Sequence, residues 1–412
     1  MRCPAFCASW GGYMKRFVLK NRRDWIYCAV MLVVCVALCF LPEYSYTEYG
    51  AIPRERVRVL EVDNSQLMPL GIVYSGVQYC EVEILSGEHA GQTCHGSNYM
   101  NSALDKDKLF EVGDEALAMI QGDANTLSAT LIDHYRLTSE GWLFGLFALL
   151  LMLFGGITGC GALISLLASV LVVWKVLVPA LLNGMDPIWT SLAVVLALTV
   201  MIDTLVTGFT RKTLVALVGS LAGTLVTCVL SVVFGNMLRL DGGSMNYVVP
   251  LLMQSTITID IRELFFSMAF IANSGALMDL SMDIASACGE ICVHSPDISR
   301  RALVKSGFAV GRNVIGTMTT TLMLAYSGSY LTLMLFFAGQ GTPVIDILNL
   351  KYVAGEILIT LVGSFGLVTV APFTALAAGA LYRGRRRGKA IGAQEPAGAS
   401  AQSDATHAAA EP

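Results

Sequence analysis

Residues 141–182 decide the fold, and they read GWLFGLFALLLMLFGGITGCGALISLLASVLVVWKVLVPALL, with Lys175 as their only charged residue. A single helix of this length would extend about 63 Å, at about 1.5 Å per residue. The hydrocarbon of a bilayer is only about 30 Å thick. The segment therefore predicts two membrane crossings, with the bend in the glycine-rich stretch GGITGCG at residues 155–161.

The whole chain has the composition of a membrane protein rather than that of a soluble domain. Of its 412 residues, 55% are apolar and 14% are charged, whereas soluble domains carry about 25% charged residues. The expected fold class is an all-α polytopic membrane helix bundle of about eight transmembrane helices. Apart from the two crossings within 141–182, the predicted spans are 25–41, 188–207, 214–234, 264–287, 314–338 and 352–381.

The first apolar run, residues 25–41, has two interpretations. Basic residues precede it, as they precede the apolar part of a cleaved signal peptide. The run is long for such a peptide, and Trp25 suits the membrane interface. We therefore expect an uncleaved first transmembrane helix, preceded by a basic cytoplasmic N-terminus at residues 1–24.

The basic residues predict the orientation of the chain. The four loops and ends expected in the cytoplasm hold seventeen of the 27 Lys and Arg residues. Cytoplasmic segments are enriched in these residues, and an even number of spans puts both termini on that side. The bundle is expected over 141–382, with a partly inserted piece at 247–253. A basic and then disordered cytoplasmic tail is expected over 383–412.

Residues 42–140 form the one large soluble-looking segment, expected as an extracytoplasmic acidic domain. Between residues 44 and 140 there are fifteen Asp and Glu against six Lys and Arg. Alternating polar and apolar residues predict strands and a small β-barrel. The predicted strands are 56–62, 77–85, 109–115 and 127–137. Cys80 and Cys94 lie in this domain, where a disulfide and two free thiols both stay open.

The second half of the chain resembles a known family. The stretch from Asp260 to Tyr326 carries the elements GALMD (275–279), DIAS (283–286), GRN (311–313) and GTM (316–318). With the preceding NGMDP element at 183–187, these resemble the YibE/F family of bacterial multi-pass membrane proteins. The resemblance implies a barrel-like domain after the first span and location in the bacterial cell membrane, but no defined activity. Asn273 and Asn313 depart from the pattern, which favours a small residue and an acid there.

Asp279 and Asp283 are the sharpest candidates for function. They are four residues apart on a predicted span, so they share one helical face. Ionisable residues within a span cost several kcal/mol and are usually functional. The pair could bind a proton or a cation. Alternatively, both could lie near the inner headgroups or hydrogen-bond to Arg312 and to hydroxyls of the next span.

Other polar residues in the spans are candidates to join this pair. Hydroxyl groups can also bond to carbonyls one turn back in their own helix, so the threonines have a purely structural alternative. The candidate polar or ion-binding residues beyond the aspartate pair are Asp203, Asn273, Arg312, Asn313, Thr317 and Thr320.

The segment 295–305 predicts a short amphipathic helix, capped by Ser295, whose basic face attracts anionic lipid headgroups. Cys288, Cys292 and His294 are too loosely spaced to predict a metal site. No phosphate-binding glycine motif follows a strand, and no catalytic set is evident. We expect neither an enzyme nor a cofactor nor nucleic-acid binding.

Two functional hypotheses follow. The first is a transporter or permease for an unknown small solute or ion, coupled to protons or a cation through Asp279 and Asp283. The second is a non-transport assembly or accessory protein whose outer domain binds an envelope protein. Besides the lipid bilayer and the solute, the expected partners are such a protein or further copies of this chain.

Overall fold

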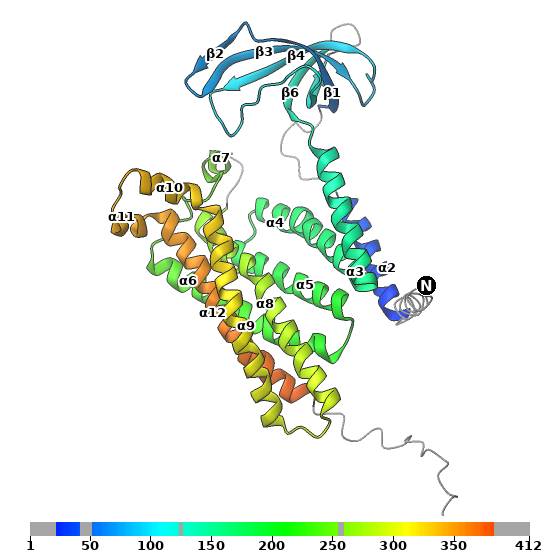
Figure 1. Ribbon diagram of the computed structural model, residues 1–412, viewed down its shortest axis with the longest axis vertical. Helices are drawn as coiled ribbons and strands as arrows, with labels where there is room; N and C mark the ends of the chain where they lie inside the picture. Colours follow the sequence, from blue (N-terminus) through cyan, green and yellow to red (C-terminus); the bar gives the residue numbers. More distant parts are fainter. Residues whose placement is uncertain (1–21, 42–51, 123–126, 254–258, 383–412) are drawn as a thin grey trace, which may run out of the picture. The chain divides into compact units, whose positions relative to one another are not determined.

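The computed structural model describes residues 22–41, 52–122, 127–253 and 259–382. It divides into two compact units, residues 1–179 and 180–412 (Figure 1). Each unit is described by itself. The expected N-terminus up to residue 21 and the expected tail from residue 383 lie outside the described residues.

The strands of unit 1 form a closed barrel, which confirms the prediction for residues 42–140 as far as they are described. β1 pairs with both β3 and β5, so the order β1-β5-β6-β4-β3 returns to its start. β2 only extends β3 as a short hairpin. The strands are β1 (Arg54–Asp63), β2 (Leu67–Leu70), β3 (Val73–Ile84), β4 (Thr93–Asn101), β5 (Glu115–Gln121) and β6 (Ser128–His134).

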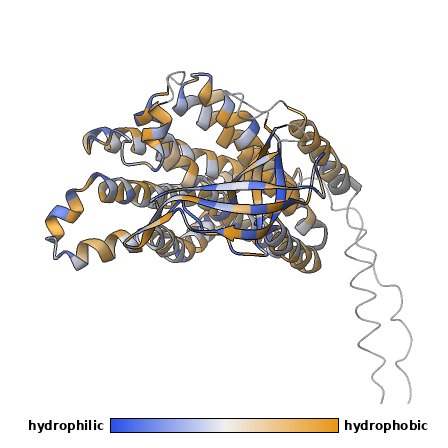
Figure 2. Ribbon diagram, turned by 90° about the horizontal axis from the view of Figure 1, so that it is seen from above, coloured by the Kyte–Doolittle hydropathy of each residue, from blue (hydrophilic) through white to orange (hydrophobic). Residues whose placement is uncertain are grey.

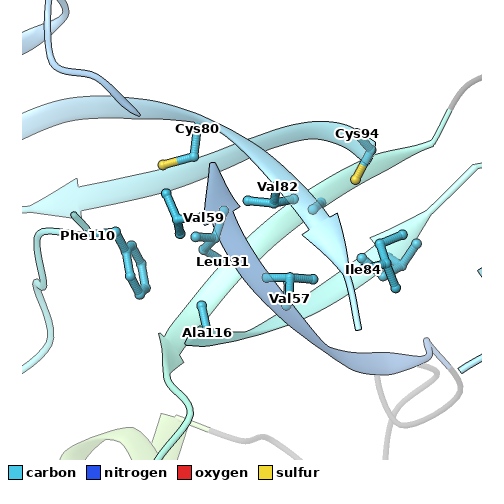
Figure 3. Packing of buried hydrophobic residues seen from close by; sticks show 12 residues of the cluster. Val57, Val59, Cys80, Val82, Ile84, Cys94, Phe110, Ala116 and Leu131 are labelled. Atoms are coloured by element: carbon cyan, nitrogen blue, oxygen red, sulfur yellow. The ribbon is translucent and has the colours of Figure 1, made fainter. Parts of the chain in front are cut away.

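The pairing pattern identifies the type of barrel. β4 and β6 run parallel, while every other described pair is antiparallel. With β2 set aside, this is the strand arrangement of the OB-fold, a five-stranded Greek-key barrel. Alternate side chains fill its interior (Figure 3). The buried core includes Val57, Val59, Val82, Ile84, Phe110, Ala116 and Leu131.

Three of the four predicted strands are confirmed, and one is wrong. The predictions at 56–62, 77–85 and 127–137 correspond to β1, β3 and β6, but residues 109–114 are irregular and β5 begins only at Glu115. The reason lies in two buried amides. The Gln78 side chain donates to the carbonyl of Phe110 at 3.0 Å and accepts from its N–H at 3.1 Å. Asn98 donates to the carbonyl of Lys108 at 2.7 Å, so side chains replace the strand partner.

The disulfide alternative for Cys80 and Cys94 is not formed in the structure, where both are buried free thiols. Cys80 pairs with Gly96, and Cys94 pairs with Val82. The two thiols are therefore diagonal rather than directly opposite, about 7–8 Å apart between Cα atoms of such pairs, which disfavours a bond. Figure 3 shows them at separate positions. Burial raises the pKa of Cys80 to about 11, so this thiol is unreactive at neutral pH.

The helices of unit 1 partly match the predicted spans. α3 (Leu137–Val172) is broken at Gly156, whose φ of 54° lies in the left-handed region that favours glycine. The break separates two candidate spans, Leu137–Gly156 and Thr158–Leu182, and confirms the bend. The second candidate span continues through η2 (Val173–Leu177) and α4 (Val178–Leu182). α2 (Arg22–Cys39) has an apolar part, Ile26–Cys39, of about 21 Å, short of the ~30 Å of hydrocarbon.

Unit 2 holds the remaining helices. Side chains cap several of them: Asp186 accepts from the N–H groups of Ile188 and Trp189, and Pro187 occupies the first turn of α5. The helices are α5 (Pro187–Thr207), α6 (Arg211–Met237), α7 (Val248–Met253), α8 (Ile261–His294), α9 (Arg300–Ser329), α10 (Leu331–Gly339), α11 (Val344–Asn349) and α12 (Lys351–Leu381).

The predicted number of about eight spans is not confirmed by the described residues. Six described helices are long and apolar enough to cross a membrane, and a seventh span results if α9 and α10 count as one. These two are bent by 62°, so the span expected at 314–338 falls on the end of α9 and on α10 and is broken between them. The spans expected at 188–207, 214–234, 264–287 and 352–381 fall on α5, α6, α8 and α12. Figure 2 shows the predominantly hydrophobic colouring of the helices.

Close approach of α6 to α12 holds unit 2 together. Gly219 and Gly223 of α6 face Thr374 and Val370 of α12, and a Cβ at either glycine would overlap the opposing side chain. The Gly-x-x-x-Gly motif thus serves helix packing. Leu277 of α8 packs into the same core. α8 contacts α5, α6, α9 and α12, so it is the central helix of the unit.

Candidate functional site

One face of α8 is open and acidic. Asp279 and Asp283 are both exposed, and Gly275, one turn earlier on the same side, has no atom within 4 Å of the place where a Cβ would lie. We call Gly275, Asp279 and Asp283 the open face. Within the described residues, neither carboxylate accepts a hydrogen bond or forms an ion pair. The predicted alternative of bonds to Arg312 or to the hydroxyls of the next span is therefore absent there.

The length of α8 fixes the depth of these acids. Its 34 residues extend about 51 Å, and Asp279 lies about 27 Å from its first residue, Ile261. A hydrocarbon layer of about 30 Å that lies within the helix contains Asp279 wherever it is placed. The helix also continues to His294, so it does not end before the acids. Asp283 lies about 33 Å from Ile261, so the requirement holds in every position for Asp279 alone: a carboxylate at this depth requires hydration or a partner.

Asp203 of α5 lies next to the open face. Its side chain is 2% exposed, and one carboxylate oxygen, Oδ2, has no hydrogen-bond partner among the described residues. It interacts electrostatically with Asp279, which in turn interacts with Asp283. The three acids therefore form one connected group across α5 and α8. Of the predicted site residues, the structure thus brings together Asp203, Asp279 and Asp283.

The hydroxyls of α9 are bonded within their own helix. Thr317 donates to the carbonyl of Val314 at 2.9 Å, and Thr320 donates to that of Gly316 at 3.0 Å. Both hydroxyl protons are therefore used in bonds within α9, as the structural alternative for these threonines predicts. Both side chains are nevertheless exposed, as is Asn313. Their oxygen atoms remain accessible on the surface of α9, but none of them hydrogen-bonds to the acids among the described residues.

Asn273 is a tether rather than a binding residue. It is fully buried, and its amide donates to the carbonyls of Ala269 at 2.7 Å and of Ile359 on α12 at 3.1 Å. The hydroxyl of Tyr326 on α9 donates to its oxygen at 3.3 Å. The amide also fills the space above Gly363, where a Cβ would overlap it. The asparagine thereby links three helices.

Arg312 lies apart from the acids, on the side of α9 that faces Leu376 of α12. The short helix predicted at 295–305 is also wrong. Ser295 ends α8, and Ser299 caps α9 by accepting from the N–H of Ala302. The basic residues form the first turns of the long α9, because the apolar sequence after Lys305 continues the helix into the bundle.

Two polar contacts were not predicted from the sequence. The carboxylate of Glu356 hydrogen-bonds to the hydroxyl of Tyr330 at the break between α9 and α10. In the loop after α6, Asp241 pairs with Lys351 at 2.5 Å, and the hydrogen bond from Lys351 lowers the pKa of Asp241. Each pair joins residues that are far apart in the sequence, so neither composition nor spacing signals it.

The acidic group is suited to weak, reversible binding of a proton or a hydrated cation. No group of three or more His, Cys, Asp or Glu residues in the described chain is arranged to hold a metal ion. Carboxylates that are exposed and unpaired can exchange a ligand with water. The buried Asp203 is a third carboxyl group, and it interacts electrostatically with Asp279.

Comparison with known protein families gives one result. The family model described as YibE/F-like protein matches residues 143–384, which is more than half of the chain. The match includes the open face, Asp203 and Arg312, and it begins after the barrel. The search of curated proteins and that of solved structures each find no match.

Proposed function

Because this chain belongs to the YibE/F-like protein family and carries unpaired acids on a membrane-spanning helix, we propose that it is a permease. Its open face, with Asp203 behind it, forms the binding site for a transported or coupling cation, a proton being the simplest case. The exposed position of Asp279 at hydrocarbon depth carries this proposal.

Contact with lipid would make these two carboxylates energetically unfavourable. A charged side chain at the centre of a bilayer costs about 2.5–3.5 kcal/mol even on the most lenient scale. Two carboxylates one turn apart add mutual repulsion to this cost. Water or a cation at the open face would reduce both the cost of burying the charges and the repulsion between them. This supports a hydrated path along α8.

The arrangement also supports reversible exchange. Asp279 and Asp283 are accessible and lack ion-pair partners in the described chain, so a bound cation competes with water alone. Asp203 has one carboxylate oxygen without a hydrogen-bond partner among the described residues. A cation on the open face is stabilised directly by Asp279 and Asp283, and Asp203 acts on it only through its electrostatic interaction with Asp279.

The double variant Asp279→Asn/Asp283→Asn tests the proposal. Purified protein is reconstituted into liposomes that contain a pH-sensitive dye, and proton uptake is driven by an imposed potential, with Na⁺, K⁺ and Mg²⁺ gradients tested in parallel. Wild-type protein should move at least one of these ions, and the variant should lower that flux at least about tenfold, which corresponds to about 1.4 kcal/mol.

Asp346→Asn is the matched control, because it removes an exposed aspartate from α11 and should leave the flux unchanged. Equal flux through the wild type and the double variant would contradict the proposal. A folded wild-type protein that moves none of the tested ions would contradict it as well.

A further inference from the structure

Unit 2 contains a basic groove along α9. Its cavity of about 620 Å³ is lined by four cationic side chains of that helix, Arg300, Arg301, Lys305 and Arg312. Val304 and Phe308 of α9 and Leu376 of α12 complete its walls. We call this cavity the basic groove. It is separate from the open face, whose residues belong to α8.

Among the described residues, no acid neutralises the four cations. All four are exposed, and Arg301, Lys305 and Arg312 share one side of α9. Within the described ranges, none of the four forms an ion pair with an acid. By contrast, Lys212 at the same end of the unit is paired with Glu290 at 3.1 Å. The groove thus concentrates positive charge that the described protein does not neutralise.

The groove runs from the helix end to hydrocarbon depth. Arg312 lies about 18 Å along α9 from Arg300, and the whole helix extends about 45 Å. A hydrocarbon layer of about 30 Å placed on α9 includes Arg312 in every position. An unpaired arginine at that depth needs an anion or water. The exposed Phe308 and Leu376 border it with apolar surface.

We propose that the basic groove binds the headgroup of an anionic phospholipid. The phosphate lies among Arg301, Lys305 and Arg312, and an acyl chain follows Phe308 and Leu376. Arginine suits phosphate because its planar group donates two parallel hydrogen bonds. Basic pockets between membrane helices are a recognised form of lipid-headgroup site. A free phosphate would meet the same cations, but it would leave the apolar wall uncovered.

Lipid binding to purified full-length protein tests this proposal. Native mass spectrometry measures the binding of phosphatidylglycerol and of phosphatidylcholine to the wild type and to Arg301→Gln/Lys305→Gln. Phosphatidylglycerol should bind the wild type more tightly than phosphatidylcholine. The variant should weaken it about fivefold for each cation removed. Arg211→Gln/Arg239→Gln removes the same charge outside the groove and should have no effect.

Further arms separate the alternatives. Arg301→Lys keeps the charge and should retain most of the binding, which guards against a variant that merely misfolds. Sodium phosphate, compared with chloride at equal ionic strength, should not displace phosphatidylglycerol at millimolar concentration. Displacement at that concentration would assign the groove to free phosphate and overturn the lipid proposal. Equal binding of the two lipids, or equal loss in the control variant, would overturn it too.

Discussion

Replacing Gly219 with leucine is expected to prevent the bundle of unit 2 from forming. A Cβ at this position would already overlap the side chain of Thr374, whose Cβ it would approach to 2.9 Å. Both atoms belong to helices in the core of the unit, so α6 and α12 would have to separate. Overpacking of a core costs about 1–3 kcal/mol or more, and here the added Cβ would also lie 3.2 Å from the Cα of Thr374 in the opposing helix.

The measurement is the monodisperse fraction on gel filtration in mild detergent, together with the apparent midpoint of thermal unfolding. Gly219→Leu should elute as aggregate or unfold at a markedly lower temperature. Gly275→Leu is the matched control, because nothing lies within 4 Å of its Cβ position. It should elute and melt like the wild type. Normal behaviour of Gly219→Leu would contradict the described packing of α6 on α12.

Replacing Asp203 with valine is expected to stabilise the protein and to abolish ion flux. The side chain is 2% exposed and one of its oxygens has no partner in the described chain. Removing such an unsatisfied group gains about 1–3 kcal/mol. The same substitution removes one of the three carboxylates that the proposed site uses, so the flux should fall at least about tenfold. Opposite effects on stability and function are typical of functional sites.

Ser191→Ala is the control for this experiment. Its hydroxyl, on the same helix, is also buried and without a partner in the described residues, but it lies about 18 Å from Asp203 along α5. It should raise the apparent melting temperature slightly and leave the flux intact. A flux through Asp203→Val equal to that of the wild type would remove Asp203 from the site.

The sequence was sufficient for those features that depend on long apolar runs and on special residues. The uncharged run 141–182 predicted two crossings, and Gly156 provides the bend because of its positive φ. Strand alternation predicted β1, β3 and β6. It failed for β4, whose inward positions include Gly96 and Asn98, and for β5, whose small apolar residues are typical of helices.

The site was predicted only in part, because sequence spacing shows which residues share a helix face but not which neighbours cover that face. The spacing of Asp279 and Asp283 places them on one face in any helix, and the structure confirms that they share it. Spacing does not reveal which face of a helix is covered by neighbours. Asn273 therefore looked like a site residue although it is a buried tether, and Arg312 looked like a partner of the acids although it borders a different groove.

Thiol accessibility of the open face decides whether water reaches Asp279 and Asp283. In a full-length protein without its native cysteines, single cysteines are introduced by Gly275→Cys and by Leu225→Cys. Leu225 is exposed on α6, two residues from Gly223, which packs against Leu277, so the two sites lie at a similar depth. A charged, membrane-impermeant thiol reagent should label Gly275→Cys at least about tenfold faster. Equally slow labelling of both cysteines would show that lipid or protein covers the open face.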